Sequence, residues 1–147
     1  MLIYDLNANP LNSNEWAFPL TECFHITSFA LSIGTIMLVD LRLLGLAFRH
    51  QTAGQLMKDT SLWTLAGLII VIISGLLIFS SDPIRYLYNG GFRWKMVALV
   101  LAIVFNYTIH RKVALSGSSP LAARMVGALS VFLWILVPFG GIWISFV

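Results

Sequence analysis

The sequence predicts an all-α integral membrane protein, a four-helix bundle of up-down-up-down arrangement with almost nothing outside the bilayer. Two observations support this prediction: the composition of the chain and the length of its apolar stretches. Of the 147 residues, 59% are hydrophobic and 10% are charged, whereas a soluble domain has roughly 45–50% apolar and about 25% charged residues. A globule of this size cannot bury so much apolar surface, so we expect the excess to face lipid.

The chain has four apolar stretches that can each cross a bilayer. Crossing about 30 Å of hydrocarbon takes about 20 helical residues. Short connections between consecutive spans make them antiparallel neighbours within a single transmembrane domain, residues 1–147. We expect helices over residues 16–48, 61–80, 92–112 and 122–146.

The distribution of Lys and Arg predicts the orientation, because the cytoplasmic side carries the excess of positive charge. We therefore expect both termini outside, N-out and C-out, and we interpret the net charge of +3 as a topology signal rather than a nucleic-acid footprint. The lipid bilayer is the expected partner, with other membrane subunits or a second copy as further partners, and no nucleic acid. The basic residues expected inside are Arg42, Arg49, Lys58, Arg111, Lys112 and Arg124, against Arg85, Arg93 and Lys95 outside, where the acidic N-terminal segment with Asp5 also lies.

The first span carries a polar stripe along one face. At 100° per residue its polar side chains fall within an arc of about 140°. Small hydroxyl residues in such a stripe can simply let helices pack closely and hydrogen-bond, whereas ionisable groups inside a span are costly and are candidate functional groups. The stripe consists of Thr21, Glu22, His25, Ser28, Ser32, Thr35 and Asp40.

Glu22 and His25 are neighbours on that face, three residues apart in the chain. A carboxylate beside an imidazole fixes its tautomer and raises its basicity, which is the support that a metal-ligating histidine receives. His25 is therefore a candidate axial ligand for a metal, with Glu22 orienting it. A proton-handling or purely structural histidine is the alternative.

The third span has a polar side made of Lys95, Asn106 and His110. His110 lies near the inner end and His25 near the outer side, at least about 15 Å apart by the helical rise, so the two cannot clasp one haem. Lys95 lies on the same side of the membrane as His25 and is its best-placed partner. His110 can also be an interfacial anchor.

Two further charge groups belong to the polar residues of the interior. Asp40 and Arg42, in the segment DLRLLG, lie toward the inner end of the first span, where an ion pair with Arg111 or Arg124 is expected. Asp82 follows the second span in SSDPIRY, where the proline favours a helix end. Asp82 and the basic residues after it can pair with each other or bind an anion such as a haem propionate.

The segment WAFPLTECFHITSFALSIGTIMLVDLRLLGLAFR resembles a family of small, uncharacterised four-helix proteins of the bacterial inner membrane, a domain of unknown function. The matching features continue with DP after the second span, FRWK at the start of the third, HR at its end and a Trp in the fourth. The resemblance implies a multi-pass protein of the bacterial inner (plasma) membrane, and it implies no activity.

A more distant likeness concerns cofactors. His25, followed nine residues later by Gly34 and then by an Arg-containing exit, is similar to the haem-binding membrane protoporphyrinogen oxidase and to the copper-resistance D proteins. This likeness implies haem b with His25 as axial ligand and Lys95 or Arg93 as second ligand or propionate partner. The two histidines of the oxidase's third helix are replaced here by Arg93 and Asn106, so the oxidase reaction itself is not implied.

These patterns lead to three expectations about function. The first is a b-type haem near the outer face that serves electron transfer or membrane redox chemistry, in which case the protein is a haem-dependent oxidoreductase. The second is a non-catalytic subunit or assembly factor of a larger membrane complex. The third is a path for protons, metal ions or a small solute along the polar stripe. The sequence has no ionisable group between His25 and Asp40 on that stripe, which weighs against the third.

Overall fold

The computed structural model describes residues 8–146, which form helices and no strands. The first residues of the chain, with Asp5, and Val147 lie outside the described part. The elements in chain order are α1 (Pro10–Ser13), α2 (Ala17–Leu43), α3 (Ala53–Ser81), α4 (Pro83–Tyr88), α5 (Gly90–Phe105), a π-helical turn (Asn106–His110), α6 (Arg111–Ser116) and α7 (Pro120–Trp143).

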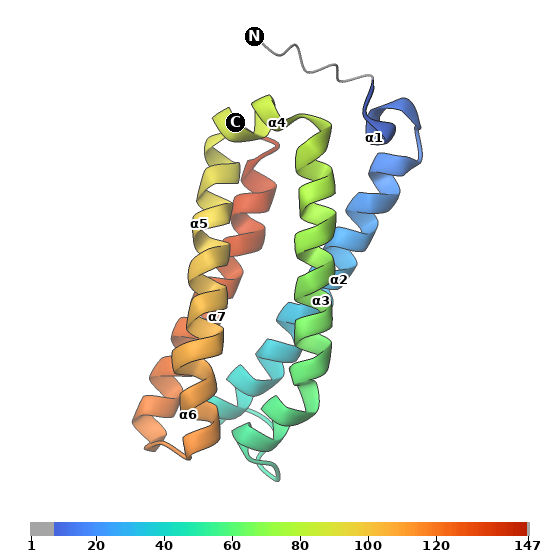
Figure 1. Ribbon diagram of the computed structural model, residues 1–147. Helices are drawn as coiled ribbons and strands as arrows, with labels where there is room; N and C mark the ends of the chain where they lie inside the picture. Colours follow the sequence, from blue (N-terminus) through green and yellow to red (C-terminus); the bar gives the residue numbers. More distant parts are fainter. Residues whose placement is uncertain (1–7, 147) are drawn as a thin grey trace.

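Four helices are long and apolar enough to cross a membrane, which confirms the all-α prediction with four apolar spans. They are α2, α3, α7 and the continuous helix Gly90–Ser116 that α5, the π-helical turn and α6 build together. The loop between α2 and α3 and the loop between α6 and α7 lie at one end of the bundle, here called the α6 end (Figure 1). The opposite end carries α1, α4 and the last turn of α7 and is called the α4 end (Figure 1).

The first span is shorter than predicted. Helix α2 ends at Leu43, although the apolar pattern continues to residue 48. Two residues in the left-handed region follow it, Gly45 with φ of 76° and Phe48 with φ of 55°. Glycine adopts this conformation without steric cost and commonly ends a helix, so the chain turns here despite its apolar composition.

The second span is longer than predicted. Helix α3 begins at Ala53, well before the expected start at residue 61. A capping box closes its first turn, because Thr52 Oγ1 accepts from the Gln55 backbone N–H and Gln55 Oε1 accepts from the Thr52 backbone N–H. These two bonds satisfy donors that a helix start leaves open, so the helix extends through residues too polar for an apolar span.

The core of the bundle contains two clusters of buried apolar side chains. The central cluster is closed by Trp134 of α7, whose ring centroid lies 6.3 Å from that of Phe29 on α2. The face of α2 opposite its polar stripe points outward, with Leu20, Phe24 and Leu31 all exposed. The central cluster comprises Ile36, Leu68, Ala98, Ala102, Trp134 and Val137, and the second cluster, toward the α6 end, comprises Val39, Leu43, Leu56, Met57 and Ala114.

Helices α2 and α3 approach each other closely at Gly67. A Cβ atom at this position would overlap Ser32 Oγ and lie 2.9 Å from the backbone oxygen of Ser28. Ser28 and Ser32 are both buried in this contact. The polar stripe of α2 therefore faces α3 here, as small residues at a helix interface allow.

Candidate functional site

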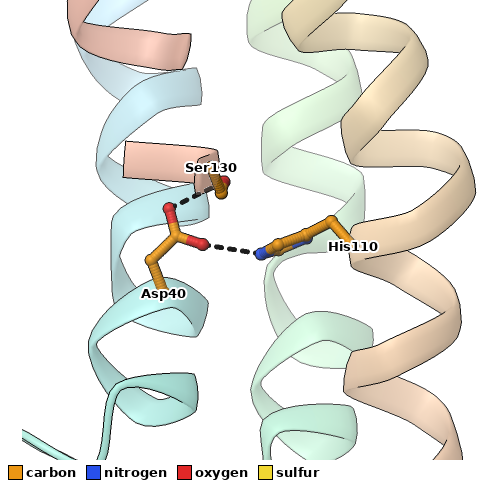
Figure 2. A network of polar contacts seen from close by, with 3 residues as sticks. All are labelled: Asp40, His110 and Ser130. Atoms are coloured by element: carbon orange, nitrogen blue, oxygen red, sulfur yellow. Dashed lines mark hydrogen bonds and ion pairs between the residues drawn. The ribbon is translucent and has the colours of Figure 1, made fainter. Parts of the chain in front are cut away.

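A buried carboxylate, that of Asp40, joins three helices near the α6 end (Figure 2). Its Oδ1 lies 2.6 Å from His110 Nε2, and its Oδ2 accepts a hydrogen bond of 2.9 Å from Ser130 Oγ. All three residues have a relative exposure of 0%. Asp40 belongs to α2, His110 to the π-helical turn and Ser130 to α7, so this polar cluster connects elements that are distant in the chain.

Two local features bring these side chains together. The π-helical turn Asn106–His110 places one extra residue in its ring of hydrogen bonds and so rotates His110 relative to a regular helix; such turns are frequent at functional sites. On α7, Gly127 lets the helix approach α2, because a Cβ there would lie 3.2 Å from the Asp40 backbone oxygen and 3.1 Å from Leu43 Cβ. Ser130 then lies one turn further along α7, within reach of the carboxylate.

The geometry of this cluster is not that of a Ser-His-Asp triad. In a triad the serine hydroxyl bonds to the histidine that takes its proton. Here Ser130 Oγ donates to Asp40 Oδ2, whereas His110 Nε2 contacts Oδ1 of the same carboxylate. The arrangement is suited to keeping one proton between a carboxylate and an imidazole, since charge-assisted bonds of this kind are short.

This cluster corrects two interpretations drawn from the sequence. The ion pair of Asp40 with Arg111 or Arg124 is wrong, because both arginines are exposed and the carboxylate is bonded to His110. His110 is not an interfacial anchor, since its side chain is completely buried. The sequence did place Asp40 and His110 toward the same end of the bundle, but it did not predict that they contact each other.

Sequence reasoning missed Ser130. The signal was present, because Ser130 is the single hydroxyl residue within Pro120–Trp143, where mean apolarity is high. A lone hydroxyl in such a helix needs a partner, and an acidic group on another span is the partner that it finds here.

At the opposite, α4 end, the His25 ring is held against α3. Its Nδ1 atom lies 2.9 Å from Ser74 Oγ. Ser74 Oγ has one proton, and the closest acceptor for it is the Ile70 backbone oxygen at 2.6 Å. The hydrogen-bond pattern therefore assigns the proton of a neutral imidazole to Nδ1 and leaves the lone pair on Nε2. Gly75 makes room for the ring, since a Cβ there would lie 3.2 Å from His25 Cε1.

The other three residues predicted around His25 take different positions. Glu22 is exposed, so Ser74, and not Glu22, contacts the ring nitrogen. Lys95 turns inward against α7, where its Nζ lies 3.5 Å from the position of a Cβ at Gly141. The charge of Lys95 interacts with both Glu22 and His25, whereas Arg93 is exposed. The structure thus brings Glu22, His25 and Lys95 into one electrostatic neighbourhood.

The remaining predicted polar residues have structural partners or lie inside the bundle. Arg42 donates through Nε to the backbone oxygen of Gln51, which fixes the loop between α2 and α3. Asp82 caps α4, because its Oδ1 accepts from the Arg85 backbone N–H at 3.1 Å. Asn106 is buried in the π-helical turn, one turn before His110.

The two ends of the bundle are too far apart to act on one small cofactor. Fifteen residues of α2 separate His25 from Asp40, which corresponds to about 22 Å of helix. Because Asp40 contacts His110, the two histidines are separated by a similar distance. Among residues 8–146, no group of three His, Cys, Asp or Glu side chains gathers in a way that could hold a metal ion.

Comparison with known proteins places the chain in a family without an assigned role. No curated protein and no solved structure matches it. A family model described as a family of unknown function, DUF6644, matches residues 17–147, which includes all four long apolar helices. The chain therefore belongs to the DUF6644 family.

Proposed function

We propose that this protein is a multi-pass protein of the bacterial inner membrane, with both termini outside, that carries protons through the polar interior of its bundle. The observation that supports this proposal is the buried contact between Asp40 and His110 at 2.6 Å. In this proposal the α6 end is the cytoplasmic end. The pair is the group that takes up and releases the proton.

The energetics of the bilayer favour a protonatable role for this pair. A lone carboxylate inside a membrane span costs roughly 3 kcal/mol or more, so such groups are paired and mark ion or proton pathways. Movement of one proton across the 2.6 Å contact between Asp40 Oδ1 and His110 Nε2 converts an ion pair into a neutral pair. That step requires no rearrangement of either helix.

Hydroxyl groups occupy the interface between His25 and Asp40, where the sequence has no ionisable residue. Ser32 Oγ donates to the Thr64 backbone oxygen at 3.2 Å, and the hydroxyls of Thr35 and Thr64 lie 2.7 Å apart. Hydroxyls both donate and accept, so together with water they can pass a proton along the α2–α3 interface. With these hydroxyls in place, the wide spacing between His25 and Asp40 no longer weighs against a proton path.

The proposal is tested by proton flux in proteoliposomes that contain a trapped pH-sensitive dye and are energised by a potassium gradient with valinomycin. Asp40→Asn and His110→Gln are the test variants, and Ser130→Ala is the matched control, because it removes one bond to the same carboxylate but keeps the pair. We expect flux from the wild type and Ser130→Ala and none from the two test variants. Wild-type vesicles no more permeable than empty ones, or full flux in Asp40→Asn, would contradict the proposal.

A second candidate function, a b-type haem bound at His25, is supported by the bond between His25 Nδ1 and Ser74. A histidine that ligates a metal through Nε2 has its other ring nitrogen fixed by a hydrogen bond, and the assigned proton on Nδ1 matches this arrangement. Lys95 would be the second ligand or propionate partner, and Arg93 a propionate partner at the surface. The apolar hollow of about 240 Å³ between α5 and α7 is lined by neither His25 nor Lys95, so it does not fit a porphyrin held by His25.

An oxidised-minus-reduced visible spectrum of the purified protein tests this second candidate. A Soret band with reduced α and β bands, absent from His25→Ala, would support it. A colourless wild type from cells supplied with haem would exclude it. If the wild type is colourless and conducts no protons, a subunit or assembly role becomes the remaining proposal, and co-purification of a stable membrane partner would test that role.

A further inference from the structure

A small cavity with both polar and apolar lining residues lies between α2, α3 and the π-helical turn, and neither Asp40 nor His110 itself lines it. Its volume is about 30 Å³. Val39, the neighbour of Asp40, and Arg111, the neighbour of His110, both line it. A cavity needs roughly 10–15 Å³ and two to four polar partners to hold a water molecule, so this one has the size for water. Its lining residues include the polar Thr35, Thr60, Ser61, Thr64, Asn106 and Arg111.

Asn106 provides an independent sign that something is bound there. Its Oδ1 is one of the buried side-chain atoms of residues 8–146 that have no hydrogen-bond partner, and the residue is 6% exposed. A buried polar atom without a partner costs about 1–3 kcal/mol, so such atoms usually bond to ordered water. Because Asn106 lines the cavity, the missing donor belongs inside it.

The threonine hydroxyls of the cavity cannot be that donor. Thr60 Oγ1 donates to the Leu56 backbone oxygen at 2.8 Å. Thr35 Oγ1 and Thr64 Oγ1 share one proton across their 2.7 Å contact. The second proton has a backbone acceptor nearby, either the Ser32 oxygen at 2.8 Å from Thr35 or the Thr60 oxygen at 3.1 Å from Thr64. Both hydroxyls then retain lone pairs but no proton, so a water molecule can donate to them and to Asn106 Oδ1.

We propose that this cavity is a water-binding site and that it brings water from the α6 end into the neighbourhood of the Asp40–His110 pair, whose chain neighbours Val39 and Arg111 line it. The first half of the inference, bound water, depends only on the cavity and Asn106. The second half, supply of water to the pair, rests on the proposed proton function. Tyr107 and Arg111 line the cavity and are also exposed, so the cavity lies close to the surface of the bundle.

Silver ions, which are close to water in size and react with thiols, test whether the cavity is hydrated. Cys23→Ala removes the single native thiol, which is exposed on the outer face of α2. In that background Thr64→Cys places a thiol in the cavity. Leu68→Cys, one turn further along α3, is the matched control, because Leu68 is 3% exposed and lies in the dry central cluster.

Silver is added to sealed vesicles of known orientation. After denaturation, maleimide labels the thiols that silver left free, so the loss of labelling counts the blocked thiols. Since thiol reactivity follows access, we expect Thr64→Cys to react at least about tenfold faster than Leu68→Cys, and from the α6 end alone. Asn106→Leu in the same background should slow the reaction of Thr64→Cys by filling the cavity. If Thr64→Cys does not fold, Thr60→Cys, on the same cavity wall, replaces it.

Equal protection of the two thiols, or equal reaction of both, would overturn the water site. Reaction from the α4 end alone would overturn the access route. These outcomes are separate from the flux measurement. Silver access at Thr64→Cys with no proton flux in the wild type would leave a hydrated cavity without the proposed function. If proton flux depends on Asp40 but the Thr64→Cys thiol is protected from silver, the proposed function would stand and this water route would fail.

Discussion

Asp40 and His110 are 70 residues apart in the chain and meet at 2.6 Å in the interior of the bundle. This contact fastens α2 to the helix that continues from α5 through the π-helical turn into α6, and Ser130 adds α7 to the same carboxylate. The polar cluster thus contributes to the fold as well as to any chemistry. In a proton carrier, the loss of Asp40 or His110 abolishes proton flux. In a purely structural cluster, the loss of either residue only lowers the free energy of unfolding.

The coupling between Asp40 and His110 can be measured with a double-mutant cycle. Asp40→Ala leaves His110 Nε2 buried without a partner, and His110→Ala does the same to Asp40 Oδ1. Hydrogen bonds between spans contribute up to about 1–2 kcal/mol, and residues in contact are non-additive. We therefore expect the double variant to lose about 1–2 kcal/mol less than the sum of the two singles.

The measurement is reversible unfolding in mixed detergent micelles with increasing SDS. Ser130→Ala combined with His110→Ala is a useful reference, since both residues bond to Asp40 but not to each other. Additive losses for Asp40→Ala and His110→Ala would mean that the bond contributes nothing to stability, and the cluster would then have to be retained for its chemistry alone.

Gly67 determines how closely α2 and α3 pack. In Gly67→Ala the new Cβ would lie 2.9 Å from the backbone oxygen of Ser28, which cannot move without its helix. Overpacking of this kind costs about 1–3 kcal/mol, so the free energy of unfolding should fall by that amount. Gly34→Ala is the matched control on α2, because nothing lies within 4 Å of a Cβ there. If Gly34→Ala lowered the free energy of unfolding as much as Gly67→Ala, the close contact at Gly67 would not be the cause of the loss.

Much of the fold followed from apolarity, and the features that did not follow were set by a helix cap and by left-handed backbone conformations. The four spans appear in the sequence because each is long and apolar, but α3 begins at Ala53 on account of a capping box between Thr52 and Gln55. Apolarity alone does not report such caps. The end of α2 likewise depends on Gly45 and Phe48, whose left-handed backbone interrupts an apolar run.

The sequence predicted residues of the candidate site but not which of them contact each other. Asp40 and His110 both stood out as ionisable residues on inward faces, and both are buried. Their partnership depends on a π-helical turn, which has no sequence signal that regular helical periodicity can detect. The orienting partner of His25 was assigned to Glu22 within the same helix, whereas the structure supplies Ser74 from α3. The partner of His25 therefore comes from a neighbouring helix and not from its own helix.

Tyr86 gives a prediction about alkaline pH. It lies on α4 outside the long apolar helices, and its ring packs at a tilt against those of Phe79 and Phe92, with centroids 6.2 and 5.5 Å away. Burial raises the pKa of the Tyr86 phenol above its ordinary value, against smaller opposing effects of Ser81 and Arg85. A pKa raised by folding means that the stabilisation is complete below the unfolded pKa of about 10 and is lost as the pH rises through the folded value.

We therefore expect the wild type to lose stability above about pH 10 more steeply than Tyr86→Phe, which cannot ionise. Thermal unfolding in detergent between neutral and strongly alkaline pH measures this difference. Tyr88→Phe is the control, because Tyr88 is 87% exposed on the same short helix. Parallel pH curves for the wild type and Tyr86→Phe would show that the Tyr86 phenol does not titrate with folding.

The tautomer of His25 gives the last prediction, and it bears on the haem candidate without requiring haem. Ser74 Oγ donates to the Ile70 backbone oxygen and accepts from His25 Nδ1, so the neutral ring should carry its proton on Nδ1. Nitrogen-15 chemical shifts of labelled histidine distinguish the two ring nitrogens. We expect a protonated Nδ1 and a bare Nε2 in the wild type, and a mixture of tautomers in Ser74→Ala. A bare Nδ1 in the wild type would reverse the hydrogen bond to Ser74 and remove the lone pair that an iron atom would need on Nε2.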